Sequence, residues 1–285
     1  MANRHRQPGL PPGRAGARRL SRPRAPERLP GLIDSHAHLQ DRRFDADRDA
    51  VLDRAREAGI ERILVPGWDL PSSEAALALA ARHPDLIHAA VGLHPHDVAV
   101  MDEPAWARLE QLAAEPTNAA IGEIGLDYHR LRSPADAQRD ALGRQLALAA
   151  RLDLPVLVHD REAHADVEAA LTAWAGCQGS DARGVLHAFS GDAAMAGRLS
   201  AVGFLVSFAL PVAFRSATGP RAAASVIGTG RFVVETDAPY LGPDREQRNE
   251  PITTLRVVAE LARLRGTTPE ALVAPIRAAF DALIR

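Results

Sequence analysis

The chain has 285 residues, which fits one large α/β domain, and 46% of them are hydrophobic, enough for a buried core. Its single cysteine, Cys177, excludes an internal disulfide framework and a metal site made of cysteines alone, and it favours a reducing, cytoplasmic location. No apolar stretch is long enough to predict a membrane span. All 34 basic residues are arginine, because the sequence contains no lysine.

The net charge of −2 is unevenly distributed along the chain. Residues 1–30 contribute +7, with eight arginines and one glutamate, which leaves −9 for residues 31–285. An acidic body argues against a protein that coats nucleic acid with a broad basic face. It is compatible with a carboxylate-lined pocket that binds cations.

Residues 1–30 are rich in Arg, Pro and Gly and lack apolar periodicity, so we expect a disordered tail before a single domain of residues 31–285. The tail has no apolar segment of the kind that a secretory signal requires. A basic arm that binds nucleic acid and a dispensable extension both fit its composition, and the second interpretation is favoured.

From residue 31 onward, short apolar runs alternate with longer segments whose apolar residues recur at helical spacing, such as 45–58 and 135–152. Continuous apolar runs are typical of strands that are buried on both faces in a parallel sheet. The eight predicted strands are Gly31–Asp34, Arg62–Val65, Ile87–Gly92, Ala119–Glu123, Pro155–Val158, Gly184–His187, Phe204–Ser207 and Phe232–Glu235.

Eight strand–helix units predict an α/β fold of the TIM type, a (β/α)8 barrel. A doubly wound open sheet is the alternative, but no G-x-G-x-x-G segment opens a helix after a strand, so its dinucleotide-binding version lacks support. In a barrel, catalytic residues gather at the carboxyl ends of the strands. Six of the eleven histidines follow predicted strands, which draws attention to that face.

The first of these positions is His36-x-His38, after the first predicted strand. In an extended segment, residues two apart point to the same side, so both imidazoles can approach one ion. Neutral imidazole nitrogen suits zinc, manganese and similar cations. Two surface histidines in a loop are the alternative interpretation of this short pattern.

Glu123 closes the predicted strand Ala119–Glu123, where a buried carboxylate requires a partner. A salt bridge to an arginine is one interpretation, and a carboxylate that bridges two cations with its two oxygens is the other. Gly122 and Gly125 beside it suit a tight loop or a close backbone approach.

His159, His187 and Asp237 also lie at the ends of predicted strands. Singly, each is explained by packing or, for Asp237, by capping of the next segment. Together on one barrel face they favour a metal site, where Asp237 could serve as both ligand and general base. Glu235, on the same side of its strand as Asp237, is a candidate supporting residue.

These side chains form a suitable ligand set for two divalent ions that activate water. Mixed imidazole and carboxylate ligands accept Zn²⁺, Mg²⁺, Mn²⁺ or Ni²⁺, so the identity of the ions stays open. No G-x-S-x-G segment is present, which disfavours a serine hydrolase. The set is His36, His38, Glu123, His159, His187 and Asp237.

The chain resembles the TatD family of metal-dependent deoxyribonucleases, within the amidohydrolase-type barrels. The matching motifs follow the family's order and spacing from residue 31 to residue 251. They are IDSHAHL (33–39), GLHPH (92–96), GEIGLDYHR (122–130), LPVLVHDREAH (154–164), GVLHAFSG (184–191), ETDAPYLGP (235–243) and RNEP (248–251).

This resemblance implies a role for each ligand. A first metal would be held by His36, His38, Glu123 and Asp237. Glu123 would bridge to a second metal, also held by His159 and His187. Glu123 and Asp237 would be the catalytic residues, with Asp237 orienting or deprotonating the attacking water.

The resemblance also implies contacts with substrate. His94 and His96 match a loop beside the metals near the substrate phosphate, and Arg161 could hold a phosphate oxygen. Ser190 and Tyr240 are further candidates for pocket contacts. Ordinary loop structure is the competing explanation for all of these residues.

Many barrel amidohydrolases bridge their metals with a carboxylated lysine, which this chain cannot supply. That absence removes the phosphotriesterase-like and dihydroorotase-like interpretations and leaves Glu123 as the bridge. Gln40 and Gln247 stand where the family usually has Asp and Lys, so an outer hydrogen bond and a phosphate contact are expected to differ. The tail before the first strand is also atypical of the family.

We therefore expect a cytoplasmic, monomeric hydrolase that cleaves phosphodiester bonds of DNA, as a 3′–5′ exonuclease on single strands. A hydrolase of a different small ester or amide is the alternative, because fold and metal site do not choose the substrate. A non-catalytic metal-binding scaffold or quality-control partner is a third hypothesis, which the complete ligand set disfavours.

Overall fold

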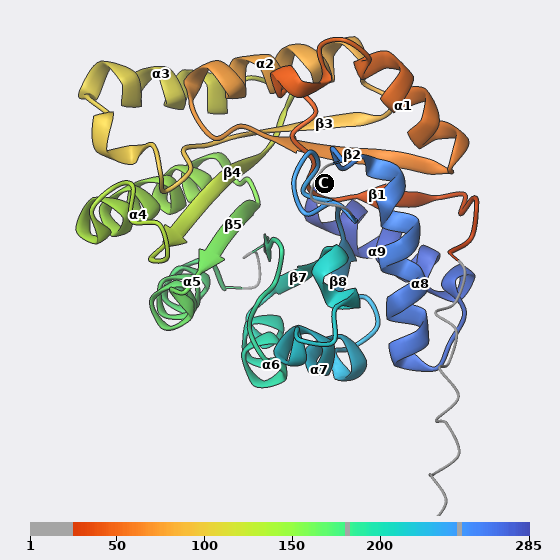
Figure 1. The fold of residues 1–285 in the computed structure, drawn as a ribbon. Helices are drawn as coiled ribbons and strands as arrows, with labels where there is room; N and C mark the ends of the chain where they lie inside the picture. Colours follow the sequence, from red (N-terminus) through yellow and green to blue (C-terminus); the bar gives the residue numbers. More distant parts are fainter. Residues whose placement is uncertain (1–24, 180–182, 244–246) are drawn as a thin grey trace, which may run out of the picture.

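A computed structural model describes residues 25–179, 183–243 and 247–285 as eight parallel strands in a barrel, with helices outside it (Figure 1). Each strand pairs in parallel with the next one along the chain. The TIM-barrel prediction is thereby confirmed. The strands are β1 (Leu32–Asp34), β2 (Ile60–Pro66), β3 (Ile87–Val91), β4 (Asn118–Asp127), β5 (Val156–Arg161), β6 (Gly184–Leu186), β7 (Phe204–Phe208) and β8 (Phe232–Val234).

The first and last strands meet and close the barrel. The Ser35 N–H donates to the Val234 carbonyl at 2.9 Å, and Ala37 forms a parallel bridge with Ala238. The chain segments that leave β1 and β8 therefore run side by side. The Asp237 N–H donates to the His36 carbonyl at 2.8 Å, which places two predicted ligands on adjacent backbone.

Several of the helices that follow strands start with a side-chain cap. Asp69, Asp102 and Asp192 each accept a hydrogen bond from the backbone N–H three residues later, which satisfies a free donor of the first turn. None of the helices in the described part of the chain has the length and apolar character that crossing a bilayer demands. The α-helices are α1 (Arg48–Glu57), α2 (Leu70–Arg82), α3 (Glu103–Ala113), α4 (Ala135–Leu152), α5 (His164–Gln178), α6 (Ala193–Ala201), α7 (Thr218–Val226), α8 (Thr254–Arg265) and α9 (Pro269–Leu283); 3-10 helices are η1 (Arg42–Phe44), η2 (Val98–Val100), η4 (Leu210–Ala213) and η5 (Pro251–Thr253).

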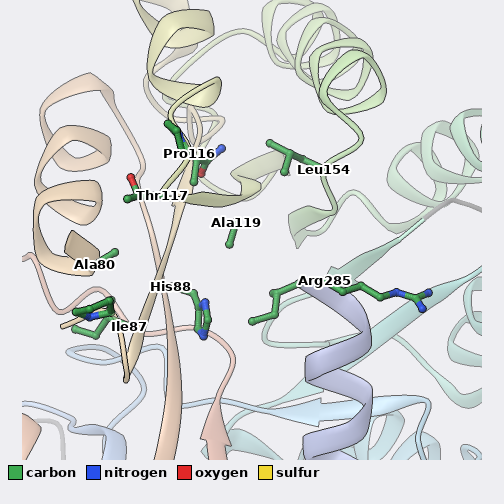
Figure 2. Close-up of a pocket in the computed structure, with 11 residues that line it drawn as sticks. Ala80, Ile87, His88, Pro116, Thr117, Ala119, Leu154 and Arg285 are labelled. Carbon is green, nitrogen blue, oxygen red and sulfur yellow. The ribbon is translucent and has the colours of Figure 1, made fainter. Parts of the chain in front are cut away.

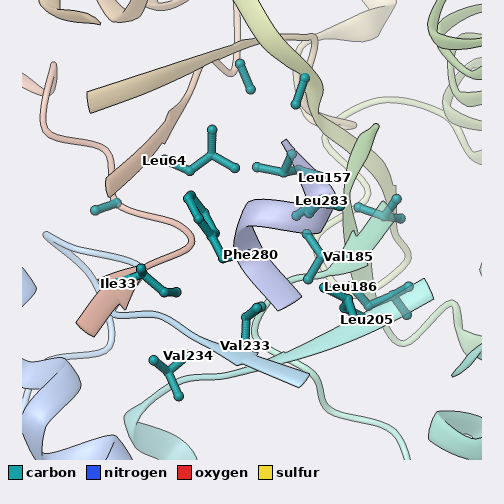
Figure 3. Packing of buried hydrophobic residues seen from close by; sticks show 14 of the residues in the cluster. Ile33, Leu64, Leu157, Val185, Leu186, Leu205, Val233, Val234, Phe280 and Leu283 are labelled. Atoms are coloured by element: carbon teal, nitrogen blue, oxygen red, sulfur yellow. The ribbon is translucent and has the colours of Figure 1, made fainter. Parts of the chain in front are cut away.

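The hydrophobic core fills the barrel and its amino-terminal end. Strand residues such as Leu64 and Val233 are fully buried, as the continuous apolar runs predict. Phe280 and Leu283 of α9 lie among the strand side chains in Figure 3 and are 0% and 3% exposed. The last helix therefore closes the end of the barrel opposite the strand carboxyl ends.

Two strands are longer than the sequence predicts. β4 continues past Glu123 to Asp127 and β5 continues past His159 to Arg161, so these two ligands lie within strands. Pairing resumes beyond a register shift between Ile121 and Ile124. Gly125 has a φ of +140°, and a Cβ there would lie 2.0 Å from the His159 carbonyl oxygen. Glycine is thus what lets β4 approach β5 closely.

The segment just before β1 packs against the barrel. Leu29 is 2% exposed, and its N–H donates to the Ala58 carbonyl at 2.9 Å. The sequence predicts disorder for residues 1–30, but the structure shows Leu29 packed and hydrogen-bonded against the barrel. The rest of that tail, residues 1–24, lies outside the described residues.

A pocket of about 390 Å³ lies at the amino-terminal end of the barrel (Figure 2). Ile87 and Asn118, at the starts of β3 and β4, line it together with His88, Leu154 and residues after α9. Two polar atoms there, His88 Nε2 and Asn118 Oδ1, have no hydrogen-bond partner among the described residues. This pocket is remote from the face that carries the predicted ligands.

Candidate metal centre

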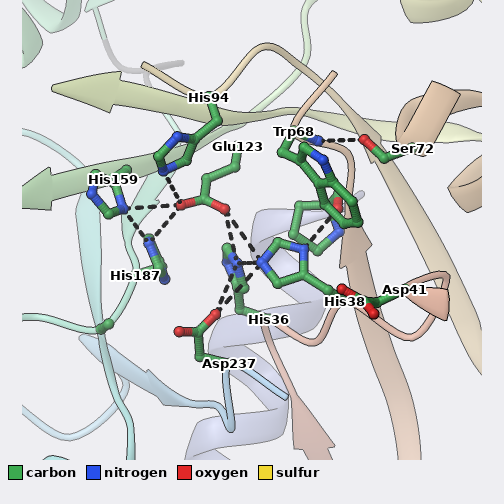
Figure 4. Close-up of polar contacts among 12 residues, drawn as sticks. His36, His38, Asp41, Trp68, Ser72, His94, Glu123, His159, His187 and Asp237 are labelled. Carbon is green, nitrogen blue, oxygen red and sulfur yellow. Dashed lines mark hydrogen bonds and ion pairs between the residues drawn. The ribbon is translucent and has the colours of Figure 1, made fainter. Parts of the chain in front are cut away.

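All six predicted ligands converge at the carboxyl ends of the strands (Figure 4). Three groups of side chains offer ligand atoms within 4.8 Å of one another: His36–Glu123–His187, His36–His38–Asp237 and His94–Glu123–His159. His36, His38, His187 and Glu123 are buried, with Glu123 only 3% exposed, while His94 and His159 are partly exposed. A buried cluster of this composition is a strong candidate for holding cations.

The first ligand group consists of His36, His38, Asp237 and one oxygen of Glu123. The two Nε2 atoms lie 3.2 Å apart, and each lies 3.4 Å from Glu123 Oε2. Asp237 Oδ1 lies 3.7 and 3.5 Å from the same nitrogens. Ligand atoms around a tetrahedral zinc ion, at roughly 2.0–2.1 Å from it, lie about 3.3 Å apart. The group therefore fits a cation of this size.

The second ligand group surrounds the other oxygen of the same glutamate. Glu123 Oε1 lies 2.9 Å from His187 Nε2 and 3.0 Å from His159 Nδ1. These two nitrogens lie 3.0 Å apart. His94 Nε2 lies 3.4 Å from the same oxygen. The donor set again suits a divalent cation with mixed nitrogen and oxygen ligands.

Glu123 is aimed between the two groups by its backbone. Its N–H donates at 2.7 Å to the carbonyl of Gly67, which follows β2, rather than to a neighbouring strand. The register shift at this point of β4 turns the side chain over the mouth of the barrel. A Cβ at Gly122 would lie 2.5 Å from the Leu157 Cβ, so this close approach also requires glycine.

The electrostatic surroundings keep the carboxylates of Glu123 and Asp237 ionised. Burial opposes the charge on Glu123, but the imidazoles of His187, His94 and His159 hold its pKa well below the usual range. Burial likewise opposes the charge on Asp237, and the hydrogen bond from His38 lowers its pKa. Burial would lower the pKa of His38, but Asp237 and Glu123 raise it to about 9. A divalent cation would replace these protons as the balancing charge.

Outer partners orient three of the imidazoles through their second nitrogen. His38 Nδ1 lies 3.2 Å from the Pro66 carbonyl oxygen. His187 Nδ1 lies 3.4 Å from Glu235 Oε1, and His159 Nε2 lies 3.5 Å from Asp127 Oδ2. The two carboxylate contacts are ion pairs rather than hydrogen bonds, since His187 Nδ1 and His159 Nε2 have no hydrogen-bond partner among the described residues. Outer partners at these positions favour a ring orientation that keeps the inward nitrogen facing the ligand cluster. Glu235 thus has the supporting position that its place in the strand predicts.

The predicted substrate residues take three different positions. His94 lies against Glu123, and its Nδ1 accepts a hydrogen bond from the His96 N–H at 3.1 Å. Burial holds the pKa of His94 well below its usual range, so this neutral ring carries its proton on Nε2 and is a donor. His96 instead bonds to Asp127 at 2.8 Å. Arg161 is exposed, and its guanidinium has no partner among the described residues.

The residues that depart from the family pattern lie outside the ligand groups. Gln40 Nε2 donates at 2.7 Å to the Pro66 carbonyl, the same oxygen that His38 contacts. Gln247 is exposed. Ser190 is also exposed, and its hydroxyl reaches only the Asp160 carbonyl, at 3.5 Å.

Three further residues contribute to the site, and the sequence analysis assigned no role to any of them. Asp127 contacts both His96 and His159, although its position at a strand end was a usable signal. Asp34 is fully buried and accepts hydrogen bonds from Thr236, at 2.6 Å from the hydroxyl and 3.0 Å from the N–H. This pair ties the segment before His36 to the segment before Asp237. Trp68 packs edge-on against His38, which nothing local in the sequence indicates.

Comparisons with known proteins agree with this geometry. Residues 33–285 match the family described as "TatD related DNase". An uncharacterized metal-dependent hydrolase, YabD of Bacillus subtilis, is 38% identical over 242 residues, which cover 84% of this chain and 93% of that protein. The 3′-5′ ssDNA/RNA exonuclease TatD of Cronobacter sakazakii is 37% identical over 246 residues, covering 84% and 92%.

Solved structures give the same result. The crystal structure of YJJV, a TatD homologue from Escherichia coli K12, superposes with a TM-score of 0.82 at 30% identity, covering 89% of this chain and 98% of that chain. A TatD-family hydrolase from Entamoeba histolytica, at 20% identity and a TM-score of 0.80, shares the fold. The chain therefore belongs to the TatD-related DNase family and is a metal-dependent hydrolase.

Proposed function

We propose that this protein hydrolyses phosphodiester bonds of single-stranded DNA from the 3′ end with the help of two divalent ions. The observation that carries the proposal is the position of the Glu123 carboxylate, whose two oxygens face two separate ligand groups. A pair of cations bridged in this way suits in-line displacement at phosphorus. The names of relatives such as the TatD exonuclease of Cronobacter sakazakii support the substrate class.

In this proposal Asp237 is the general base. Bound divalent ions supply Lewis acidity that stabilises charge on the phosphate and makes water more acidic. Asp237 Oδ1 lies with the first ligand group, while Oδ2 has no hydrogen-bond partner among the described residues and can accept the proton of the attacking water. Backbone bonds to His36 and from Tyr240 hold the Asp237 segment in place.

The remaining polar residues would bind the substrate phosphates. The Nε2–H of His94 points to the ligand cluster and can donate to a phosphate oxygen. Arg161 lies at the end of β5, and its guanidinium, which has no partner within the described part of the chain, can form a charge-assisted pair with phosphate. His96 would act through Asp127, which it shares with His159. Contacts so few, on an acidic body, predict modest affinity confined to the pocket.

The decisive assay uses a 5′-labelled single-stranded oligonucleotide incubated with Mg²⁺, Mn²⁺ or Zn²⁺. We expect a ladder of products shortened one nucleotide at a time from the 3′ end, and its loss with a chelator. A duplex of the same sequence should be a poorer substrate, and a single-stranded RNA arm tests whether the 2′-hydroxyl is tolerated. Removal of nucleotides from the 5′ end, or turnover that continues in the presence of the chelator, would refute the proposal.

Asp237→Asn provides the test of the site, because it keeps the shape of the side chain and removes the base. We expect turnover to fall by at least about 10²-fold, the lower range for a general base. Glu162→Gln is the matched control, since it neutralises an exposed carboxylate on the same face. Should the wild-type protein leave DNA intact but cleave a p-nitrophenyl ester or an amide with the same metal requirement, the alternative hydrolase would be supported.

A further inference from the structure

Two aromatic side chains flank the first ligand group. The rings of Trp68 and Tyr240 both meet His38 edge-on, with centroids 5.2 and 6.0 Å away and interplanar angles of 78° and 82°. They come from loops far apart in the sequence, after β2 and after β8. Their convergence on one ligand gives the first ligand group an aromatic wall.

Tyr240 is an exposed aromatic residue that is nevertheless held in place. It is 49% exposed. Its N–H donates to the Asp237 carbonyl at 2.7 Å. The Arg43 guanidinium lies 4.3 Å from its ring centroid and is itself fixed by a pair of hydrogen bonds to Asp41. A half-exposed aromatic ring that an arginine holds beside the first ligand group is available for contact with a substrate.

Trp68 differs from the other two tryptophans of the chain. Trp106 is buried, and the Trp174 indole donates to the Leu146 carbonyl at 2.8 Å. The Trp68 ring is only partly buried, and its Nε1 has no hydrogen-bond partner among the described residues. Its backbone is anchored between the site loops, with its N–H donating to Ser72 Oγ and its carbonyl accepting from the His94 N–H.

The two sides of the metal centre thus differ in chemistry. In Figure 4, Trp68 lies on the His38 side, while His94 and His159 lie on the other side of Glu123. The polar side suits phosphate, and the aromatic side suits a flat apolar group. A nucleotide carries both, joined through a sugar. Base stacking on aromatic rings is also tolerant of sequence, because every base has a π face.

We propose that Trp68 and Tyr240 form a subsite that holds the nucleobase of the 3′-terminal nucleotide while its phosphate lies at the metal centre. This proposal rests on the proposed function and deepens it. The subsite would position the scissile phosphate through the base and would make cleavage depend on the presence of a base more than on its identity. The competing role for the two rings is to shield His38 from water.

The test compares two oligonucleotides that differ only in the 3′-terminal residue, which is thymidine in one and an abasic tetrahydrofuran residue in the other. For the wild-type protein we expect kcat/KM to be about 5- to 100-fold higher with the base. Trp68→Ala and Tyr240→Ala should each lower kcat/KM on the base-bearing substrate and leave the abasic substrate nearly unchanged. Trp68→Phe should restore much of the preference.

Phe214→Ala is the matched control, because Phe214 is 45% exposed in the loop after β7, where it makes no aromatic contact with a ligand histidine. It should keep the wild-type preference. Equal losses on both oligonucleotides in the Trp68 and Tyr240 variants would overturn the subsite in favour of shielding. If the wild-type protein cleaved neither oligonucleotide, the proposed function and this inference would both fall.

A binding measurement gives an independent readout. Thymidine 5′-monophosphate added to the metal-loaded protein should quench tryptophan emission, because a stacked base lies against the Trp68 indole. Trp68→Phe should abolish that quenching and leave the emission of Trp106 and Trp174 unchanged. Quenching that persists in Trp68→Phe would overturn the proposal.

Discussion

Replacing Glu123 with glutamine is the sharpest test of a shared metal bridge. The amide has the same shape, but it has no charge and offers only one oxygen to the two ligand groups. The first group contains four protein ligands and the second group three, and structural zinc sites bind with apparent free energies of about 10–16 kcal/mol. One ligand is then worth about 2.5–5 kcal/mol, so we expect the affinity for each ion to fall roughly 10²- to 10⁴-fold.

The assay is titration of the chelator-treated protein with Zn²⁺ or Mn²⁺ against a competing chelator, followed by elemental analysis of the bound metal. The wild-type protein should bind two ions, and Glu123→Gln fewer, with weakened affinity at both sites. Glu162→Gln, with its exposed carboxylate, should match the wild type. Two ions bound to Glu123→Gln with wild-type affinity would refute the bridging role.

Three further predictions concern residues outside the two ligand groups. Burial lowers the pKa of His88 to about 4, so between pH 6.5 and 4 protons bind preferentially to the unfolded chain. The wild-type protein should therefore lose roughly 1–3 kcal/mol of stability over that window in urea titrations, and a His88→Gln variant with the same loss would contradict this. Arg161→Ala should raise KM for single-stranded DNA about tenfold with kcat nearly unchanged, and an unchanged KM would remove Arg161 from substrate binding. Arg248 bonds to Asp47 and Glu250, between the loops after β1 and β8. Arg248→Met should therefore lower the free energy of unfolding by about 1–2 kcal/mol in thermal unfolding, more than Arg198→Met, which breaks an exposed ion pair. Equal losses in the two variants would show that the Arg248 network stabilises the fold no more than an exposed pair does.

The barrel could be predicted because its strands are buried on both faces and leave continuous apolar runs in the sequence. Leu64 and Val233 are core residues for the same reason that their segments were recognisable as strands. The far ends of β4 and β5 were not predicted, because Glu123 and His159 look like the ends of their strands in the sequence. Pairing beyond them depends on the close approach of Gly125 to the backbone of His159. The glycine indicated a close approach, but the sequence does not show which strand it approaches.

The ligand positions could be predicted because polar side chains at the ends of buried strands have few other reasons to be there. What the sequence left open was which atom of each side chain faces which neighbour. His159 presents Nδ1 and the other imidazoles Nε2 to Glu123, and His96 turns to Asp127 instead. Such choices depend on rotamers and on partners from other strands. The contact of Trp68 with His38 was not predictable for the same reason, because it joins side chains from two different loops.

The two ligand groups differ in how their negative charge is arranged. The first group contains Asp237 in addition to its share of Glu123. The second group has only its share of Glu123, but its imidazoles contact the outer carboxylates of Asp127 and Glu235. In the first group the outer partner of His38 is a neutral backbone carbonyl. The second ligand group therefore obtains negative charge from the outer carboxylates of Asp127 and Glu235, whereas the first group has the carboxylate of Asp237 among its own ligands.

This asymmetry predicts that Asp127→Asn weakens only one of the two ions. The substitution keeps an oxygen beside His159 Nε2 but removes the charge that raises the basicity of the ring, and loss of such a partner typically costs 10–100-fold in metal affinity. A titration with two resolved steps should show a shift of that size in one step and none in the other. Asp166→Asn, which removes a nearby exposed carboxylate, should shift neither. If both steps moved together, the charge of Asp127 would act on the cluster as a whole, and the division of the site at Glu123 would have no energetic meaning.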